Sequence, residues 1–235
     1  MSSYAADLRV GSLKPVLDVV DRQGHAVAGR LLSTGQCRDV VDMFDAPKTF
    51  RSTVDMDRHQ FGSGVYRYFA TPLPAIVDEL RHQLYGPLAE LANTWADRLG
   101  QPPYPPDLDG LHRRCADAGQ HKPTPLLLRY GPSGYNCLHQ DVYGDVTFPL
   151  QVAVMLSRPD RDFTGGESVF VEQRPRAQSR ASVARPGQGE ALVFAVRDRP
   201  VPGHRGYKRV AMRHGVSEVR SGERFVLGII FHNAR

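Results

Sequence analysis

The sequence has few cysteines and no long hydrophobic run. Its three cysteines are Cys37, Cys115 and Cys137. They are odd in number, widely separated and without a CxxC pair, which favours a reducing cytoplasm over a disulfide framework. The longest apolar stretches, residues 126–128 and 225–231, are far too short to span a bilayer. The first ten residues contain Asp7 and Arg9 and lack the apolar segment of a signal peptide. We therefore expect a cytoplasmic protein.

No compositional bias sets the chain apart from soluble globular proteins. Of its 235 residues, 41% are apolar and 23% are charged, which argues against a disordered, collagenous or membrane chain. The net charge of +5 and the pI near 9.3 suggest an anionic partner, but an arginine-rich composition gives the same values without one. The oligomeric state is not predictable from these data.

The N-terminal half reads as mainly helical. Helices are expected at residues 36–46, 73–100 and 107–118, and in the second of these segments apolar residues recur at spacings of three and four. Pro87 is expected to split the second segment into two helices.

From residue 125 onward the pattern changes to short strands. β-Branched and aromatic residues are concentrated in residues 126–130, 148–157, 169–172, 190–196, 209–212 and 225–232. Clusters of Gly, Pro, Asp and Ser separate these runs, which favours a β-sandwich or barrel over βαβ units. The sequence therefore predicts an α+β protein in which a helical N-terminal half packs against a β-barrel core.

One short motif carries candidate metal ligands. In LHQD, His139 and Asp141 are separated by a single residue. On an extended strand, positions i and i+2 point to the same face, so an imidazole and a carboxylate can meet one ion. His214 follows another apolar strand, 73 residues after Asp141, and is the natural third ligand. Together the three form a two-His-one-carboxylate set, which leaves coordination positions open for a co-substrate and oxygen.

A candidate anchor for a dicarboxylate lies further along the chain. Arg224 stands ten residues after His214, at the start of the last expected strand. A guanidinium matches both oxygens of a carboxylate in a bidentate pair. An iron chelated by the 2-oxo acid end, with Arg224 on the distal carboxylate, is a complete site for 2-oxoglutarate.

The ordered set of HxD, His and Arg resembles the Fe(II)- and 2-oxoglutarate-dependent dioxygenase superfamily over roughly residues 126–235. The resemblance implies a double-stranded β-helix, or jelly roll, in residues 121–235, with residues 1–120 as a helical support and 1–235 as one domain. It also implies that His139, Asp141 and His214 bind Fe(II), that Arg224 binds 2-oxoglutarate, and that O2 is the oxidant.

Two branches of the superfamily look similar to this chain. GGE at residues 165–167 and the position of Arg224 are similar to prolyl-4-hydroxylases. The spacing from Tyr130 to His139 in HQD resembles the AlkB-type nucleic-acid demethylases, which implies that Tyr130 hydrogen-bonds 2-oxoglutarate. The chain departs from the AlkB pattern in its last strand, where Ile230 replaces a second arginine. Over nearly its whole length it resembles a bacterial group of oxygenases provisionally classed as acting on nucleic acid.

The resemblance implies hydroxylation of a substrate C–H bond with release of succinate and CO2. The substrate is either alkylated single-stranded nucleic acid, which loses its methyl group, or a prolyl peptide or small molecule, which keeps the hydroxyl. A non-catalytic cupin-like metal-binding barrel and a nucleic-acid-binding barrel are the alternatives of another class, and neither needs Arg224 as an anchor.

Several residues outside the triad have two interpretations. Gln151, in the middle of an expected strand, either contacts the co-substrate or is a satisfied core glutamine. Tyr135, Asn136 and Tyr143 either line the substrate entrance or face solvent. Cys137 is expected to pack inside the protein.

Three further segments have no assigned role. The basic residues of 174–185 and 197–209 lie between expected strands and either bind phosphate groups or form an ordinary solvated surface. Residues 50–69 mix aromatics with arginines, and form either a lid or stacking platform over the site or strands between the two halves.

Overall fold

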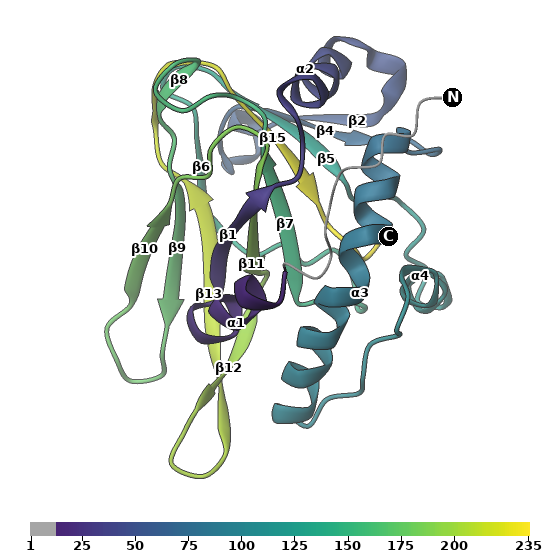
Figure 1. The fold of residues 1–235 in the computed structure, drawn as a ribbon, viewed down its shortest axis with the longest axis vertical. Helices are drawn as coiled ribbons and strands as arrows, with labels where there is room; N and C mark the ends of the chain where they lie inside the picture. Colours follow the sequence, from purple (N-terminus) through teal and green to yellow (C-terminus); the bar gives the residue numbers. More distant parts are fainter. Residues whose placement is uncertain (1–12) are drawn as a thin grey trace.

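Two antiparallel sheets face each other, with helices against the outer side of the larger one (Figure 1). The protein is described by a computed structural model that covers residues 13–235. The expectation that the first ten residues carry no signal peptide lies outside these residues. None of the helices in residues 13–235 combines the length and the hydropathy that a membrane span needs.

The larger sheet separates a helix-covered face from an inner face. In spatial order its strands are β1 (His25–Arg30), β11 (Glu190–Ala195), β7 (Leu150–Met155), β15 (Arg224–Ile229), β5 (Leu126–Tyr130), β4 (Val65–Phe69) and β2 (Phe50–Asp55). Because successive side chains alternate across a strand, Leu127 and Val152 pack in the main core with the helices, whereas Leu128 and Ala153 line an inner cavity. The alternation of side chains along these strands thus determines which of them reach the inner cavity.

The smaller sheet closes the other side of that cavity. Its strands are β10 (Arg180–Ala184), β9 (Ser168–Gln173), β13 (Tyr207–Val216), β6 (Tyr135–His139) and β3 (Gly62–Ser63), and β12 (Asp198–Pro202) also pairs with β13. A two-stranded sheet pairs β14 (Val219–Gly222) with β8 (Phe163–Gly165). Phe170 of the smaller sheet and Phe194 of the larger one contact each other, with ring centroids 5.4 Å apart. The two sheets therefore form one sandwich.

The helices come from the N-terminal half, as expected, although the first of them, Lys14–Gln23, was not predicted. They are α1 (Lys14–Gln23), α2 (Thr34–Asp42), α3 (Ala75–Arg98) and α4 (Leu108–Asp117). The prediction that Pro87 splits the second helical segment is wrong, because α3 runs through it without interruption. Leu84 and Leu88, on either side of the proline, are each 1% exposed, and this packing outweighs the backbone hydrogen bond that proline removes.

The N-terminal half is helical only in part. Besides α1 to α4 it supplies β1 to β4, and β1, β2 and β4 extend the larger sheet. The segment at residues 50–69, for which a lid and strands were both considered, forms β2, β3 and β4 with one short helical turn at Asp57–His59. The expected strands after residue 125 are all present.

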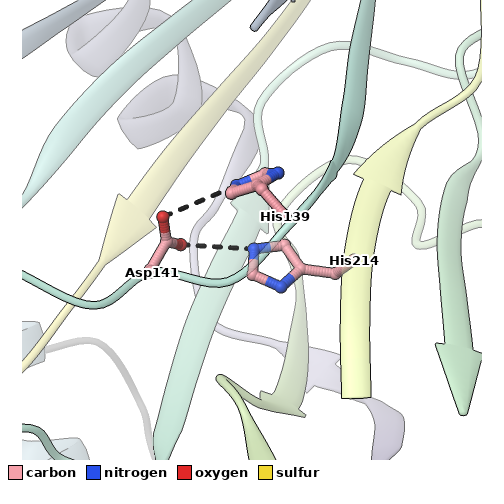
Figure 2. A group of neighbouring side chains, drawn as sticks. All are labelled: His139, Asp141 and His214. Atoms are coloured by element: carbon pink, nitrogen blue, oxygen red, sulfur yellow. Dashed lines mark hydrogen bonds and ion pairs between the residues drawn. The ribbon is translucent and has the colours of Figure 1, made fainter. Parts of the chain in front are cut away.

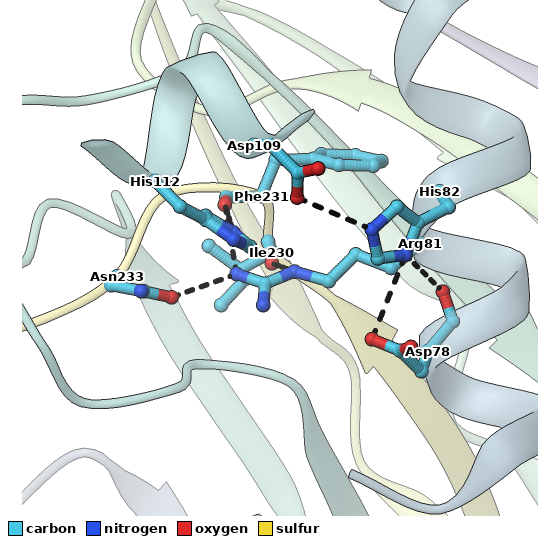
Figure 3. Close-up of polar contacts among 8 residues, drawn as sticks. All are labelled: Asp78, Arg81, His82, Asp109, His112, Ile230, Phe231 and Asn233. Atoms are coloured by element: carbon cyan, nitrogen blue, oxygen red, sulfur yellow. Dashed lines mark hydrogen bonds and ion pairs between the residues drawn. The ribbon is translucent and has the colours of Figure 1, made fainter. Parts of the chain in front are cut away.

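The C-terminal segment after β15 is held against α3 and α4 by a buried arginine (Figure 3). Arg81 of α3 is 2% exposed, and its guanidinium donates to the Ile230 carbonyl at 3.0 Å and to the Phe231 carbonyl at 2.8 Å. His112 of α4 lies 3.2 Å from the same Phe231 oxygen. These contacts fix the end of β15 against the helices.

One buried and one half-buried histidine next to this segment make stability depend on pH. His232 is 1% exposed and its Nδ1 accepts a hydrogen bond from the Phe148 N–H at 3.1 Å, and burial lowers its pKa to about 4. Burial likewise lowers the pKa of His112 to about 4. The unfolded chain takes up these protons near pH 6.5. Stability is therefore full above pH about 6.5 and falls as the pH drops toward 4.

We expect the free energy of unfolding to fall by about 2 kcal/mol on account of His232 between about pH 7.5 and about pH 5. His232→Asn keeps an acceptor for the Phe148 N–H but cannot take up a proton, so its stability should vary less with pH. Urea unfolding at the two pH values measures this, with the exposed His204→Asn as the control that keeps the parent's pH dependence. Equal pH dependence in His232→Asn and the parent would contradict the prediction.

Candidate active site

The three candidate metal ligands meet at the end of β6 (Figure 2). His139 is the last residue of β6, Asp141 follows it, and His214 lies directly opposite His139 on β13. The Asp141 carboxylate lies 3.2 Å from Nε2 of His214 and 3.5 Å from Nε2 of His139. One potential ligand atom from each of the three residues lies within 4.8 Å of the others. The structure thus brings together the three residues that the sequence pointed to.

The ionisation of Asp141 and His214 suits a cation. Asp141 is 8% exposed, and although burial by itself would raise its pKa, hydrogen bonds from the two histidines and their charge hold the pKa well below the usual range. Burial lowers the pKa of His214. A carboxylate anion and a neutral imidazole are the forms that coordinate a metal.

Further hydrogen bonds orient two of the three side chains. The Tyr143 hydroxyl donates to Oδ1 of Asp141 at 2.7 Å. Nδ1 of His139 lies 2.8 Å from the Cys137 carbonyl, so Nε2 is the ring atom left to face the cluster. Such contacts behind a ligand set its orientation and basicity. Tyr143 is half-buried and lines the cavity, as one of its two interpretations held.

A buried arginine lies in the same cavity as the cluster. Arg224, the first residue of β15, is 3% exposed, and its Nη2 donates to Ser168 Oγ at 3.3 Å. Its Nε has no hydrogen-bond partner among residues 13–235, nor does any carboxylate there pair with it. Burial lowers its pKa to about 10, so the guanidinium stays charged at neutral pH. A buried cation without a counter-ion is costly, and an anionic ligand would relieve that cost.

The other two predicted co-substrate residues also line this cavity. Tyr130 is 1% exposed, and its ring lies 5.5 Å from the Arg224 guanidinium. The Tyr130 hydroxyl accepts a hydrogen bond from Asn136 at 3.3 Å. Gln151 is 5% exposed, and its Oε1 has no partner in the described part of the chain. Gln151 is therefore not a fully satisfied core glutamine.

The cavity has a volume of about 410 Å³ and extends from the His–Asp–His cluster to Arg224 between the two sheets. Sequence reasoning missed several of its walls, which are Met56, Tyr66, Ser168, Phe170, Leu192 and Phe194. Alternation along the predicted strands could have found Leu192 and Phe194. Met56 and Tyr66 come from the N-terminal half, and only the long-range pairing of β4 with β5 brings them near.

The remaining candidates of β6 differ in whether they face solvent or the cavity. Tyr135 is 42% exposed, and Asn136 lines the cavity. The prediction that Cys137 packs inside is wrong, because the residue is exposed at the cavity. Its strand β6 is flanked on one side only by the two-residue β3, which leaves alternate side chains uncovered.

In the basic segments 174–185 and 197–209, one arginine is buried in an ion pair and the other basic side chains are exposed. Arg199 is 3% exposed and forms an ion pair with the buried Glu172, so it holds β12 to β9. The other basic side chains of residues 174–185 and 197–209 are exposed. Only this exposed set is open to a partner.

The two facing antiparallel sheets enclose a His–Asp–His cluster and a buried arginine without a counter-ion. This combination defines an oxygenase of the Fe(II)- and 2-oxoglutarate-dependent class. Residues 64–234 match the model of the Oxygenase-NA family, described as an oxygenase catalysing oxidative methylation of damaged DNA, and the chain belongs to this family. The expected superfamily and the expectation of an enzyme are confirmed.

One relative shares sequence with the chain, and two solved structures share its fold. The uncharacterized protein Rv2227 of Mycobacterium tuberculosis is 47% identical over 167 residues, which cover 71% of this chain and 72% of the relative. A Pseudomonas putida prolyl-4-hydroxylase has a TM-score of 0.53 at 14% identity, covering 95% of this chain and 99% of that one. An oxidoreductase of the 2OG-Fe(II) oxygenase family from Burkholderia pseudomallei has a TM-score of 0.53 at 16% identity, covering 94% and 92%. At these identities the two structures show a shared jelly-roll fold.

Proposed function

We propose that His139, Asp141 and His214 hold Fe(II), that Arg224 binds the distal carboxylate of 2-oxoglutarate, and that the enzyme removes methyl groups from alkylated nucleic acid. One observation carries the assignment of the site: a single cavity holds the His–Asp–His cluster at one end and an arginine without a counter-ion at the other.

The cluster fits iron in its donor set. Two imidazoles and one carboxylate are the protein ligands typical of non-haem Fe(II) oxygenases, and they leave coordination positions open. The buried carboxylate of Asp141 lies between both histidines. Burying an anion is costly, and a bound metal cation would offset that cost.

The far end of the cavity fits a dicarboxylate. Nε of Arg224 is a free donor, and the hydroxyl group of Ser168 and the ring of Tyr130 lie beside it. A carboxylate on the guanidinium forms charge-assisted hydrogen bonds, which are the strong kind. Tyr130 and Gln151 are proposed to contact the co-substrate, as the sequence suggested.

With 2-oxoglutarate and O2, bound Fe(II) supplies oxidation of a substrate C–H bond, and 2-oxoglutarate is converted to succinate and CO2. The protein's own residues hold the metal in place and exclude water from it. Asp141, held by Tyr143, fixes the metal, and Phe170, Leu192 and Phe194 form apolar walls that keep water away from the reacting atoms. A hydroxylated N-methyl group then breaks down to formaldehyde and the free amine.

The substrate assignment draws on the family description and on the entrance of the cavity. Phe61 and Leu138 line the cavity and are 49% and 41% exposed, so they present apolar surface to an incoming base. Ile230, which stands where the AlkB pattern has a second arginine, is 1% exposed and packs with Tyr68 and Leu126. This position therefore cannot contact the substrate, and contacts to an alkylated base come from other residues.

The experiment that tests the substrate is aerobic turnover with Fe(II), 2-oxoglutarate and a panel of N-methylated single-stranded oligonucleotides beside prolyl peptides. Loss of a methyl group, with one formaldehyde and one succinate for each event, is the expected result. Oxidation of a prolyl peptide with unchanged oligonucleotides would replace the nucleic acid with the alternative substrate class.

We also propose that the helical support and the catalytic core fold as one domain. β1 pairs with β11, and β4 pairs with β5, so strands from residues 1–120 complete the sheet formed by residues 121–235.

Tyr143→Phe removes the hydrogen bond to Asp141 without emptying the space beside it. We expect metal affinity to fall by about 10-fold, since loss of a group behind a ligand typically costs 10–100-fold. Anaerobic titration with Co(II), followed by its visible absorption, measures both affinity and ligand geometry. Tyr66→Phe, which alters a cavity tyrosine outside this bond, is the control. An unchanged Co(II) affinity and spectrum in Tyr143→Phe would remove Tyr143 from the site.

A further inference from the structure

The positive charge of the chain is concentrated on two neighbouring hairpins. The two hairpins, residues 168–184 and 198–216, contain eight Lys or Arg and two Asp or Glu, whereas the whole chain carries a net charge of only +5, so the remainder is net negative. β9 and β10 form one hairpin and β12 and β13 the other, and both pairs share the smaller sheet (Figure 1). Positive charge is thus concentrated on these two hairpins.

An open groove runs between the two hairpins. It has a volume of about 430 Å³, and its polar walls are Gln173, Arg174, Arg176, Asp198 and Arg209. The two acidic groups nearby are already neutralised. Asp198 lies 3.5 Å from Arg197 and 3.6 Å from Arg209, and Glu172 pairs with Arg199 as well as with Arg174. The groove therefore keeps an excess of positive charge.

Several cations of these hairpins have no internal partner. Within residues 13–235, no ion pair involves Arg176, Arg205, Lys208 or Arg213, and all four side chains are exposed. A cation that serves the fold is buried and paired, as Arg199 is. These exposed cations serve neither the fold nor the proposed iron site.

The groove is connected to the active site by one side chain. Gln140, between the two ligands of the HxD motif, donates through Nε2 to the Met212 carbonyl at 2.8 Å and to the Arg197 carbonyl at 3.2 Å. From the groove residue Arg209, β13 continues to His214 over about 17 Å at the usual rise of a strand. A chain in the groove therefore lies within a few nucleotides of the cavity.

We propose that this groove binds the phosphodiester backbone of the single-stranded nucleic acid whose base enters the cavity, an inference that rests on the proposed function. Phosphates complement the exposed guanidinium groups, and an arginine fork matches phosphate oxygens. Tyr207, 44% exposed near the tip of the second hairpin, adds an aromatic surface of the kind on which bases stack. That combination fits a nucleic acid better than an acidic protein.

The test is binding of an unmodified fluorescent single-stranded DNA of 20 nucleotides, followed by anisotropy over a series of salt concentrations without iron or 2-oxoglutarate. The variant is Arg176→Gln with Arg209→Gln. The control, Lys48→Gln with Arg113→Gln, removes the same charge from exposed positions outside the hairpins. We expect the groove variant to bind at least several-fold more weakly at low salt. The slope of log affinity against log salt should decrease by about 1.4, because each lost phosphate contact on a single strand contributes about 0.7.

Two results would overturn the proposal: equal affinity and slope in the groove variant and the parent, or an equal loss in the control pair. The proposed function is tested separately by turnover of the same sequence carrying an N-methylated base. DNA binding that depends on the groove without turnover would remove the substrate assignment and keep the groove. Methyl removal by the groove variant at the parent's rate and KM would keep the substrate and remove the groove.

Discussion

His139→Ala is expected to reduce Fe(II)-dependent formation of succinate by about 100-fold or more, since even groups behind a metal ligand are worth 10–100-fold. The side chain is 34% exposed, so its loss leaves little cavity in the core and the fold should survive. Asp141 and His214 remain, but two ligands cannot complete the set that the cluster offers.

Two measurements distinguish loss of the metal from general damage. Anaerobic calorimetry with Mn(II) should give one site in the parent and none of comparable affinity in His139→Ala. Thermal unfolding in the absence of metal should be nearly the same for both. His121→Ala, at an exposed histidine far along the sequence from the cluster, serves as the control. If His139→Ala bound Mn(II) as tightly as the parent, the iron site would have to lie elsewhere.

Arg224→Ala is expected to raise the concentration of 2-oxoglutarate needed for half-maximal turnover by about 100-fold or more while leaving metal affinity nearly intact. Hydrogen bonds to a charged group contribute about 1.5–3 kcal/mol each, and a bidentate pair loses two of them. Each 1.4 kcal/mol corresponds to a factor of 10 in affinity. Arg224 contacts neither the two histidines nor Asp141, so the metal site should be unaffected by its loss.

A co-substrate analogue makes this prediction specific. The 2-oxo acid 2-oxopentanoate lacks the distal carboxylate, so it should bind the parent and Arg224→Ala with similar, weak affinity. Arg220→Ala, at an exposed arginine of β14, controls for net charge. If 2-oxoglutarate bound the parent and Arg224→Ala equally well, Arg224 would have no role as its anchor.

The ligand set and the arginine could be predicted because each depends on local order along the chain. Alternation on a strand places His139 beside Asp141, and an arginine at the start of the last strand is read directly from the sequence. The strands after residue 125 were predictable for the same reason, since apolar runs bounded by turn residues are a local signal.

The remaining walls of the site depend on contacts between distant segments. Met56 and Tyr66 reach the cavity only because β4 pairs with β5, and no local pattern encodes that pairing. Ser168 lies beside Arg224 across the two sheets, 56 residues away in sequence. Pro87 shows the opposite error, because a local helix breaker was outweighed by the packing of Leu84 and Leu88 in the main core. Local rules therefore predicted the reactive groups better than their surroundings.

The most direct test of the account is a structure of the protein with Mn(II) and 2-oxoglutarate prepared without oxygen. The account predicts one ion in contact with His139, Asp141 and His214, and a 2-oxoglutarate whose distal carboxylate lies on the Arg224 guanidinium beside Tyr130. An ion held by other residues, or a distal carboxylate away from Arg224, would contradict it.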